Sequence, residues 1–164
     1  MSLPPRGGLQ PRLSVLDRLL DAHPDRLQDA PHGVSEAISI VRAAVHRDIE
    51  HLLNARRPWR TPSWPALERS PLGYGVADLT AGASNDPAGQ ERLRREIEDA
   101  IRRFEPRLAQ VQVRIADAPT PLRAVLRLHI DALLLIDPLP EAIAFDTLVD
   151  TTTADIVVRP TRED

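Results

Sequence analysis

The chain of 164 residues contains no cysteine, no lysine and few aromatic residues. Without cysteine it has no disulfide, no thiolate ligand for a metal and no cysteine nucleophile. All 21 basic residues are therefore arginines, which form bidentate and interfacial ion pairs better than lysines do. Aromatic residues make up 3% of the chain, so leucine, isoleucine, valine and alanine must fill the core.

The sequence also lacks a long apolar run and an excess of positive charge. No apolar run approaches the ~18 residues of a transmembrane helix, and the first residues lack the apolar region of a signal peptide. The net charge of −3 argues against a general nucleic-acid-binding role. We therefore expect a cytoplasmic protein that does not insert into a membrane and has no nucleic-acid partner.

Composition divides the chain into three parts. They are a flexible N-terminal segment of residues 1–34, a single domain of residues 35–159 and a tail of residues 160–164. Leucines at helical spacing, including Leu16, Leu19 and Leu20, predict one short amphipathic helix in the N-terminal segment. A helix of under about ten residues is marginal alone, so it needs its own domain or another subunit to pack on.

Two longer stretches have the apolar spacing of amphipathic helices. The first covers residues 35–55, with Ser35 as a plausible N-cap. The second begins at Asp86-Pro87, where an N-cap aspartate precedes a proline in the first helical turn. It ends near Phe104, where a proline follows closely.

The proline-rich stretch of residues 56–89 holds both tryptophans and the only tyrosine of the chain. A loop of this length is usually functional or disordered. Large aromatic side chains favour an ordered loop whose rings dock on the core or on a partner. Tyr74 and Asp78 therefore either hold this loop to the core or contact another protein.

After residue 106 the apolar period changes to two, which is typical of strands. Two alternating runs, 111–115 and 122–130, flank a proline-containing turn and predict a hairpin. We expect a third strand over residues 143–149, and residues 155–159 are a candidate for a short fourth strand. The predicted fold is α+β, with two main helices and the short N-terminal helix packed on a three- to four-stranded antiparallel sheet.

A stiff corner, Glu105-Pro106-Arg107, joins the second helix to the first strand. Pro106 has no N–H and disfavours helical geometry at Glu105, so the helix must stop near Phe104. The corner then holds opposite charges two residues apart. It either presents a fixed charge pair to a partner or forms an ion pair inside the chain, of Glu105 with Arg102 or Arg107.

Residues that support chemistry are few. His46 and His51 are five residues apart, so on a helix they point in different directions and do not form a metal site. The sequence contains no nucleophile elbow and no phosphate loop, and no cofactor is expected. Glycoside hydrolysis needs two carboxylates ~5–9 Å apart, and the spacing pairs none of the candidates across a cleft. Those candidates are Asp48, Glu50, Asp78 and Glu105.

Five segments, in order along the chain, resemble the TssE family of type VI secretion baseplate subunits. This family is related to the sheath-initiator proteins of contractile-phage baseplates. The segments are LDRLL (16–20), VHRDIEHLLNARRP (45–58), SPLGYGVADLT (70–80), IRRFEPRL (101–108) and FDT (145–147). The segment after Asp150 is only loosely similar to the end of the family.

The resemblance implies a structural subunit of the baseplate wedge that helps to nucleate polymerisation of the contractile sheath. Its implied partners are TssF- and TssG-like subunits and sheath subunits, in a baseplate docked at the inner membrane. We expect no enzymatic activity. The expected partner contacts are Glu105, Pro106, Arg107, Leu16, Leu19, Leu20, Tyr74 and Asp78. The alternatives are a lysozyme-like peptidoglycan hydrolase that uses Glu105 as acid and an adaptor unrelated to secretion.

Overall fold

A computed structural model describes residues 33–57, 64–77, 86–116, 125–136, 139–150 and 152–161. The predicted N-terminal helix, with Leu16, Leu19 and Leu20, lies outside these described residues, and so does Asp78. In chain order the elements are α2 (Val34–Asn54), β1 (Arg56–Arg57), the 3₁₀ helices η1 (Pro65–Arg69) and η2 (Pro71–Gly73), β2 (Val76–Ala77), α3 (Pro87–Phe104), β3 (Leu108–Ala116), β4 (Val125–Leu134), β5 (Glu141–Asp150) and β6 (Ile156–Pro160).

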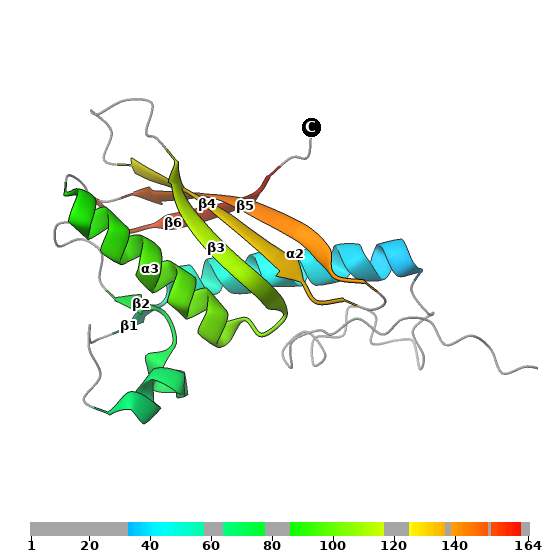
Figure 1. Cartoon of the computed structure of the whole chain (residues 1–164), viewed down its shortest axis with the longest axis horizontal. Coiled ribbons are helices and arrows are strands. Elements are labelled where there is room, and N and C mark those ends of the chain that lie inside the picture. Colours follow the sequence, from blue (N-terminus) through cyan, green and yellow to red (C-terminus); the bar gives the residue numbers. More distant parts are fainter. Residues whose placement is uncertain are drawn as a thin grey trace, which may run out of the picture.

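Strands β3 to β6 form one antiparallel sheet in their sequence order, which confirms the predicted α+β fold with four strands (Figure 1). The fourth strand, left open by the sequence, is β6. A second sheet was not predicted. It is the parallel pair of β1 and β2, two residues each, inside the stretch expected to be a loop.

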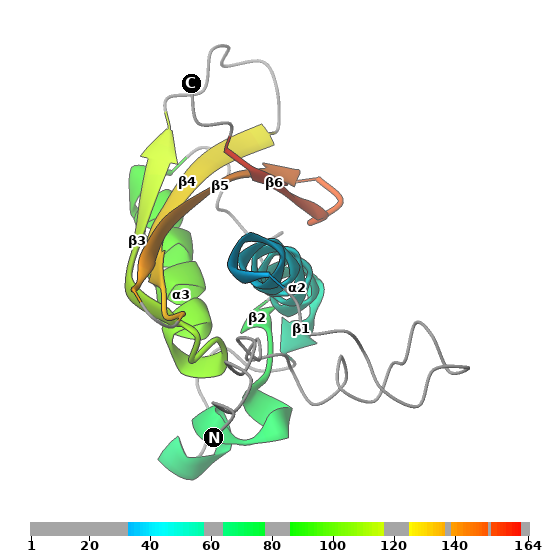
Figure 2. The same ribbon diagram turned by 90° about the vertical axis from the view of Figure 1, so that its right-hand side faces the viewer.

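The sheet curves around α2, and α3 lies against β3 on the same side of the sheet (Figure 2). The alternating strand residues that point to this side are buried between the sheet and the two helices. The largest fully buried side chains are Phe145, Ile49, Leu52, Leu53, Ile97, Ile101, Leu128, Ile130, Leu134, Val41, Val45 and Val76. Apart from Phe145 they are all aliphatic, as the composition requires.

The helix ends test the capping predictions. Asp86 caps α3 as predicted, because its carboxylate accepts hydrogen bonds from the backbone N–H groups of Ala88 and Gly89. The N-cap of α2 is Gly33 and makes no side-chain hydrogen bond, so the prediction of Ser35 as N-cap was wrong. Within the described residues, neither helix has the length and apolar character that a membrane span requires.

Candidate interaction sites

The Glu105-Pro106-Arg107 corner encloses an ion pair inside the chain. Glu105 follows the last residue of α3 and is only 4% exposed. The Arg107 guanidinium donates to both of its carboxylate oxygens, with Nε 2.7 Å from Oε1 and Nη2 2.5 Å from Oε2. The backbone N–H of Arg107 also donates to Oε1. The sequence left open whether the corner presents its charges to a partner or pairs them inside the chain. In the structure Glu105 and Arg107 form the intrachain pair.

A third charge ties this corner to the other long helix. Nη2 of Arg107 lies 2.6 Å from Oδ2 of Asp48 on α2. Burial lowers the pKa of Arg107, but hydrogen bonds and charge from Glu105 and Asp48 outweigh it and raise the pKa above its ordinary value. Because α2 and α3 are far apart in sequence, this cluster fixes how the two helices and the start of β3 meet.

The residues at and beside the corner differ in how far a partner could reach them. Pro106 is exposed, whereas the Arg107 side chain is 12% exposed. Nη1 of Arg107 is buried and has no hydrogen-bond partner in the structure, which is costly for a charged donor. Tyr74 packs edge-on against Phe104, with ring centroids 5.3 Å apart. Burial raises the pKa of the Tyr74 hydroxyl, and the charges of Asp48 and Glu105 raise it further.

The outer edge of β3 is covered by side chains of α3. Arg102 donates to the carbonyl of Val111 at 2.7 Å, and Arg94 donates to the carbonyl of Val113 at 3.1 Å. The N–H of Val113 donates to the carboxylate of Glu98 at 3.1 Å. Three charged side chains of α3 thus occupy backbone groups to which another strand would otherwise bond.

Side chains of α2 cover the opposite edge of the sheet, at β6. The amide of Asn54 donates to the carbonyl of Ile156 at 2.7 Å and accepts from its N–H at 3.0 Å. Nε2 of His46 lies 2.8 Å from the carbonyl of Val158. The imidazole also stacks on Phe145, with ring centroids 6.0 Å apart. Helix side chains therefore bond to backbone groups of Val111 and Val113 on β3 and of Ile156 and Val158 on β6.

Within the described residues, the edge of the sheet is open where β5 extends past the end of β6. The last paired residues are Phe145 and Pro160, and the N–H of Thr161 then donates to the carbonyl of Ala144. Beyond this point no strand in the described part of the chain pairs with the outer side of residues 141–143. Because backbone groups alternate in direction along a strand, the N–H and C=O of Ala142 point to this open side.

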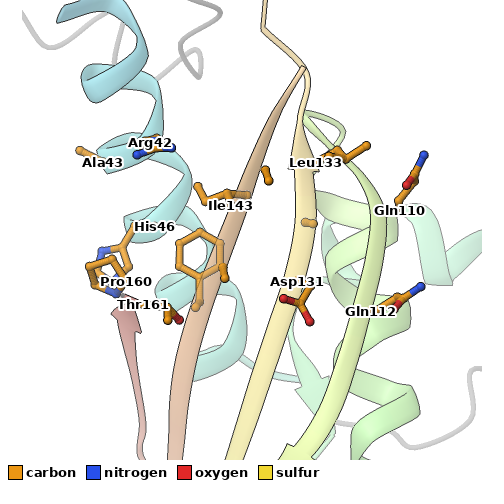
Figure 3. A pocket seen from close by; sticks show the side chains of 14 residues that line it. Arg42, Ala43, His46, Gln110, Gln112, Asp131, Leu133, Ile143, Pro160 and Thr161 are labelled. Atoms are coloured by element: carbon orange, nitrogen blue, oxygen red, sulfur yellow. The ribbon is translucent and has the colours of Figure 1, made fainter. Parts of the chain in front are cut away.

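A cavity of about 730 Å³ lies at this open edge. In Figure 3, Arg42 and His46 approach it from α2, Pro160 and Thr161 from the end of β6, and Gln112 from β3. Small or apolar residues of β4 and β5 form the strand side of the wall. These are Ala132, Leu133, Ala142, Ile143, Ala144 and Phe145. An open edge beside an apolar cavity is the geometry that accepts an extended segment of another chain.

The exposed side of the sheet carries a cluster of polar side chains. Nδ1 of His129 lies 2.8 Å from Asp146, and its Nε2 lies 3.1 Å from Asp131. Arg114 pairs with Asp131 from β3. Across the described ranges no group of three or more His, Asp or Glu residues is arranged to hold a metal ion.

The chain is similar to known baseplate proteins. Residues 39–139 match the family model described as baseplate wedge protein gp25. One similar solved structure is a chain of the baseplate complex from the type VI secretion system. It is 19% identical and aligns over 76% of this chain and 97% of its own length, with a TM-score of 0.48. No curated protein sequence matches the chain.

Proposed function

The chain belongs to the baseplate wedge protein gp25 family, and from this premise we propose that it helps to nucleate the contractile sheath of a type VI secretion baseplate. As a member of the family it is a structural component of a baseplate. The match of residues 39–139 carries the proposal, because it covers most of α2, all of α3 and the strands β3 and β4 of the main sheet. The proposed location is a cytoplasmic baseplate docked at the inner membrane.

The proposed sheath contact is the open edge of β5. A strand of a sheath subunit would add beside residues 141–143, bond to the backbone of Ala142 and fill the apolar cavity next to it. The outer edges of β3 and β6 are less suited, because α3 and α2 side chains already bond to them. This contact would extend the sheet by main-chain hydrogen bonds, which fix register as well as affinity.

The proposed contact with TssF- and TssG-like wedge subunits is the corner after α3. Pro106 is the exposed residue there, while Glu105 and Arg107 brace it from inside together with Asp48. Because the Arg107 side chain is largely buried, a partner at the corner would contact Pro106 directly. Tyr74 lies beside the corner through its contact with Phe104 and is part of the same proposed surface.

We further propose that the protein is not an enzyme. A lysozyme-like general acid must carry a proton and reach its substrate. Glu105 is almost completely buried, and both of its oxygens accept hydrogen bonds from Arg107. This geometry favours a structural role for the carboxylate over the hydrolase alternative.

The test compares two variants at Ala142, which points its N–H to the open edge. Ala142→Pro removes that N–H without breaking a bond to β4, whereas Ala142→Val keeps it and is the matched control. Each variant would be co-expressed with the products of the neighbouring baseplate and sheath genes. The readouts are the melting temperature, co-purification with wedge subunits and sheath assembly seen by electron microscopy.

We expect Ala142→Pro to fold and to co-purify with wedge subunits but to nucleate no sheath. Ala142→Val should behave as wild type in all three readouts. Normal sheath assembly with Ala142→Pro would contradict the assigned edge. If the wild-type chain neither enters a wedge complex nor supports sheath assembly, the proposed function itself is wrong.

A further inference from the structure

A lobe of residues 64–74 projects from the body of the protein and carries exposed apolar side chains. It contains η1 and η2 and lies outside the layers formed by the sheet and the two long helices (Figures 1 and 2). Trp64 is 70% exposed, Leu72 63% and Tyr74 38%. Three of the six large apolar side chains exposed in the described part of the chain are thus gathered in this lobe. Such clustering marks an interaction surface.

The backbone of the lobe is closely packed. Gly73 is buried, and a Cβ on it would lie 2.5 Å from the carbonyl oxygens of Leu67 and Glu68. Gly75, directly after the lobe, has φ +103, and a Cβ there would clash with the carbonyl of Ala55. The two glycines therefore allow approaches of backbone to backbone that no other residue permits.

Side chains also fix the lobe to α3. Arg103 donates to Glu68 of η1 at 3.1 Å, and the Tyr74 ring packs on Phe104. Exposed apolar side chains on a fixed support lose little conformational entropy when they are buried by a partner. Tryptophan and tyrosine in such positions are the residues that most often dominate binding energy.

A charge accompanies the apolar side chains. Arg69 is exposed and makes no ion pair with any residue in the described part of the chain. Arg69 is the last residue of η1 and lies three residues before Leu72 of η2 in the chain, so both belong to the surface of the same small lobe. A partner that covers Leu72 therefore also meets an unpaired cation, and a carboxylate is its complement.

We propose that this lobe inserts Trp64 and Leu72 into an apolar groove of a neighbouring baseplate subunit. The rim of that groove would carry a carboxylate that pairs with Arg69. The partner surface is concave because the lobe is a projection, and it is acidic because Arg69 is an exposed cation without an ion pair in the described part of the chain, whereas Glu68 is already paired with Arg103. The inference rests on the proposed function, since it names a second contact with the same assembly.

The test uses the full-length chain co-expressed with the products of the neighbouring baseplate genes. The variant Trp64→Ser/Leu72→Ser removes both apolar anchors, and Arg69→Glu reverses the charge. Leu139→Ser is the matched control, because Leu139 is 74% exposed and lies outside the lobe, before β5. The readouts are the melting temperature, the yield of wedge complex after affinity purification and the mass of the isolated chain by analytical ultracentrifugation.

We expect the double serine variant to keep the wild-type melting temperature and to lose about tenfold or more of its complex, as loss of a hot-spot pair implies. Arg69→Glu should lower the yield less, and Leu139→Ser should not change it. Full complex formation by the double variant would overturn the inference and leave the proposed function standing. A wild-type dimer that the double variant abolishes would assign the lobe to a second copy and also overturn it. Absence of any wild-type wedge complex would overturn both proposals.

Discussion

Replacement of Arg107 by methionine tests whether the cluster at the corner holds the fold together. The change keeps most of the apolar stem of the side chain but removes the guanidinium that binds Glu105 and Asp48. The carboxylate of Glu105 is then left buried with the single backbone N–H of Arg107 as its remaining partner in this cluster. An uncompensated buried charge is among the most destabilising changes a protein can undergo.

The structure sets the size of the effect. Breaking a fully buried ion pair from one side costs about 3–5 kcal/mol. Because the Asp48 side chain is partly exposed, we expect the lower end, about 3 kcal/mol. For a domain of this size that free energy lowers the melting temperature by roughly 6–12 °C. The Glu105→Gln/Arg107→Met double variant should recover much of this loss, since it leaves no unpaired charge at Glu105.

Urea denaturation at pH 7, followed by circular dichroism, measures these free energies. Arg95→Met is the control, because Arg95 pairs with Glu91 on an exposed face of α3 and should change stability by only about 0.5 kcal/mol. If Arg107→Met costs no more than this control, the cluster is screened by solvent and the reasoning is wrong. A double variant less stable than Arg107→Met would equally refute the role assigned to the buried charge.

Three further predictions concern the sheet edge, a glycine and a turn. Asn54→Leu leaves both backbone groups of Ile156 unpaired, so it should lower the free energy of unfolding, measured with urea, by about 1–3 kcal/mol and speed up hydrogen exchange at Ile156. Unchanged exchange at Ile156 would contradict the role of Asn54 at this edge. Gly75→Ala places a Cβ at a positive φ and against the carbonyl of Ala55, so it should lower the free energy of unfolding by about 1–3 kcal/mol or more. A variant as stable as wild type would show that the backbone around Gly75 can adjust. Hydrogen bonds from the backbone N–H groups of Thr152 and Thr153 lower the pKa of Asp150. The free energy of unfolding of wild type should therefore exceed that of Asp150→Ala at pH 7, and this difference should shrink as the pH falls below 3.8. A difference in unfolding free energy that does not depend on pH would exclude this cause.

Local patterns were sufficient to predict the two long helices and three strands of the main sheet, but not the parallel pair of β1 and β2. The period of 3.6 marked α2 and α3, and the period of two marked β3, β4 and β5, because each pattern places apolar side chains on one face. Asp86-Pro87 and Pro106 located the ends of α3 because both act within a few residues of chain. The N-cap of α2 was missed, since Ser35 and Gly33 both suit that position and the choice depends on where the preceding chain runs.

The candidate sites depended on contacts that no local pattern contains. The intrachain pair of Glu105 and Arg107 was one of two alternatives at sequence level, and the part of Asp48 in it was not foreseen. In the sequence, Asn54 and His46 are ordinary polar residues of a helix. Their hydrogen-bond partners on β6 lie more than a hundred residues later in the chain, so no local pattern reveals these bonds. The position of the open edge follows from where β6 stops relative to β5, which is a matter of strand register.

The sequence by itself determined the two long helices, three strands of the main sheet, the α+β class, the family resemblance and the apolar, aliphatic core, because these follow from residue type and short-range spacing. Only the tertiary structure decided which charges are buried at the corner, which sheet edges the helices close, and which side chains of the proline-rich stretch stay exposed. These depend on residues far apart in the chain that meet when the helices pack into the curve of the sheet, and their distances are set by that packing.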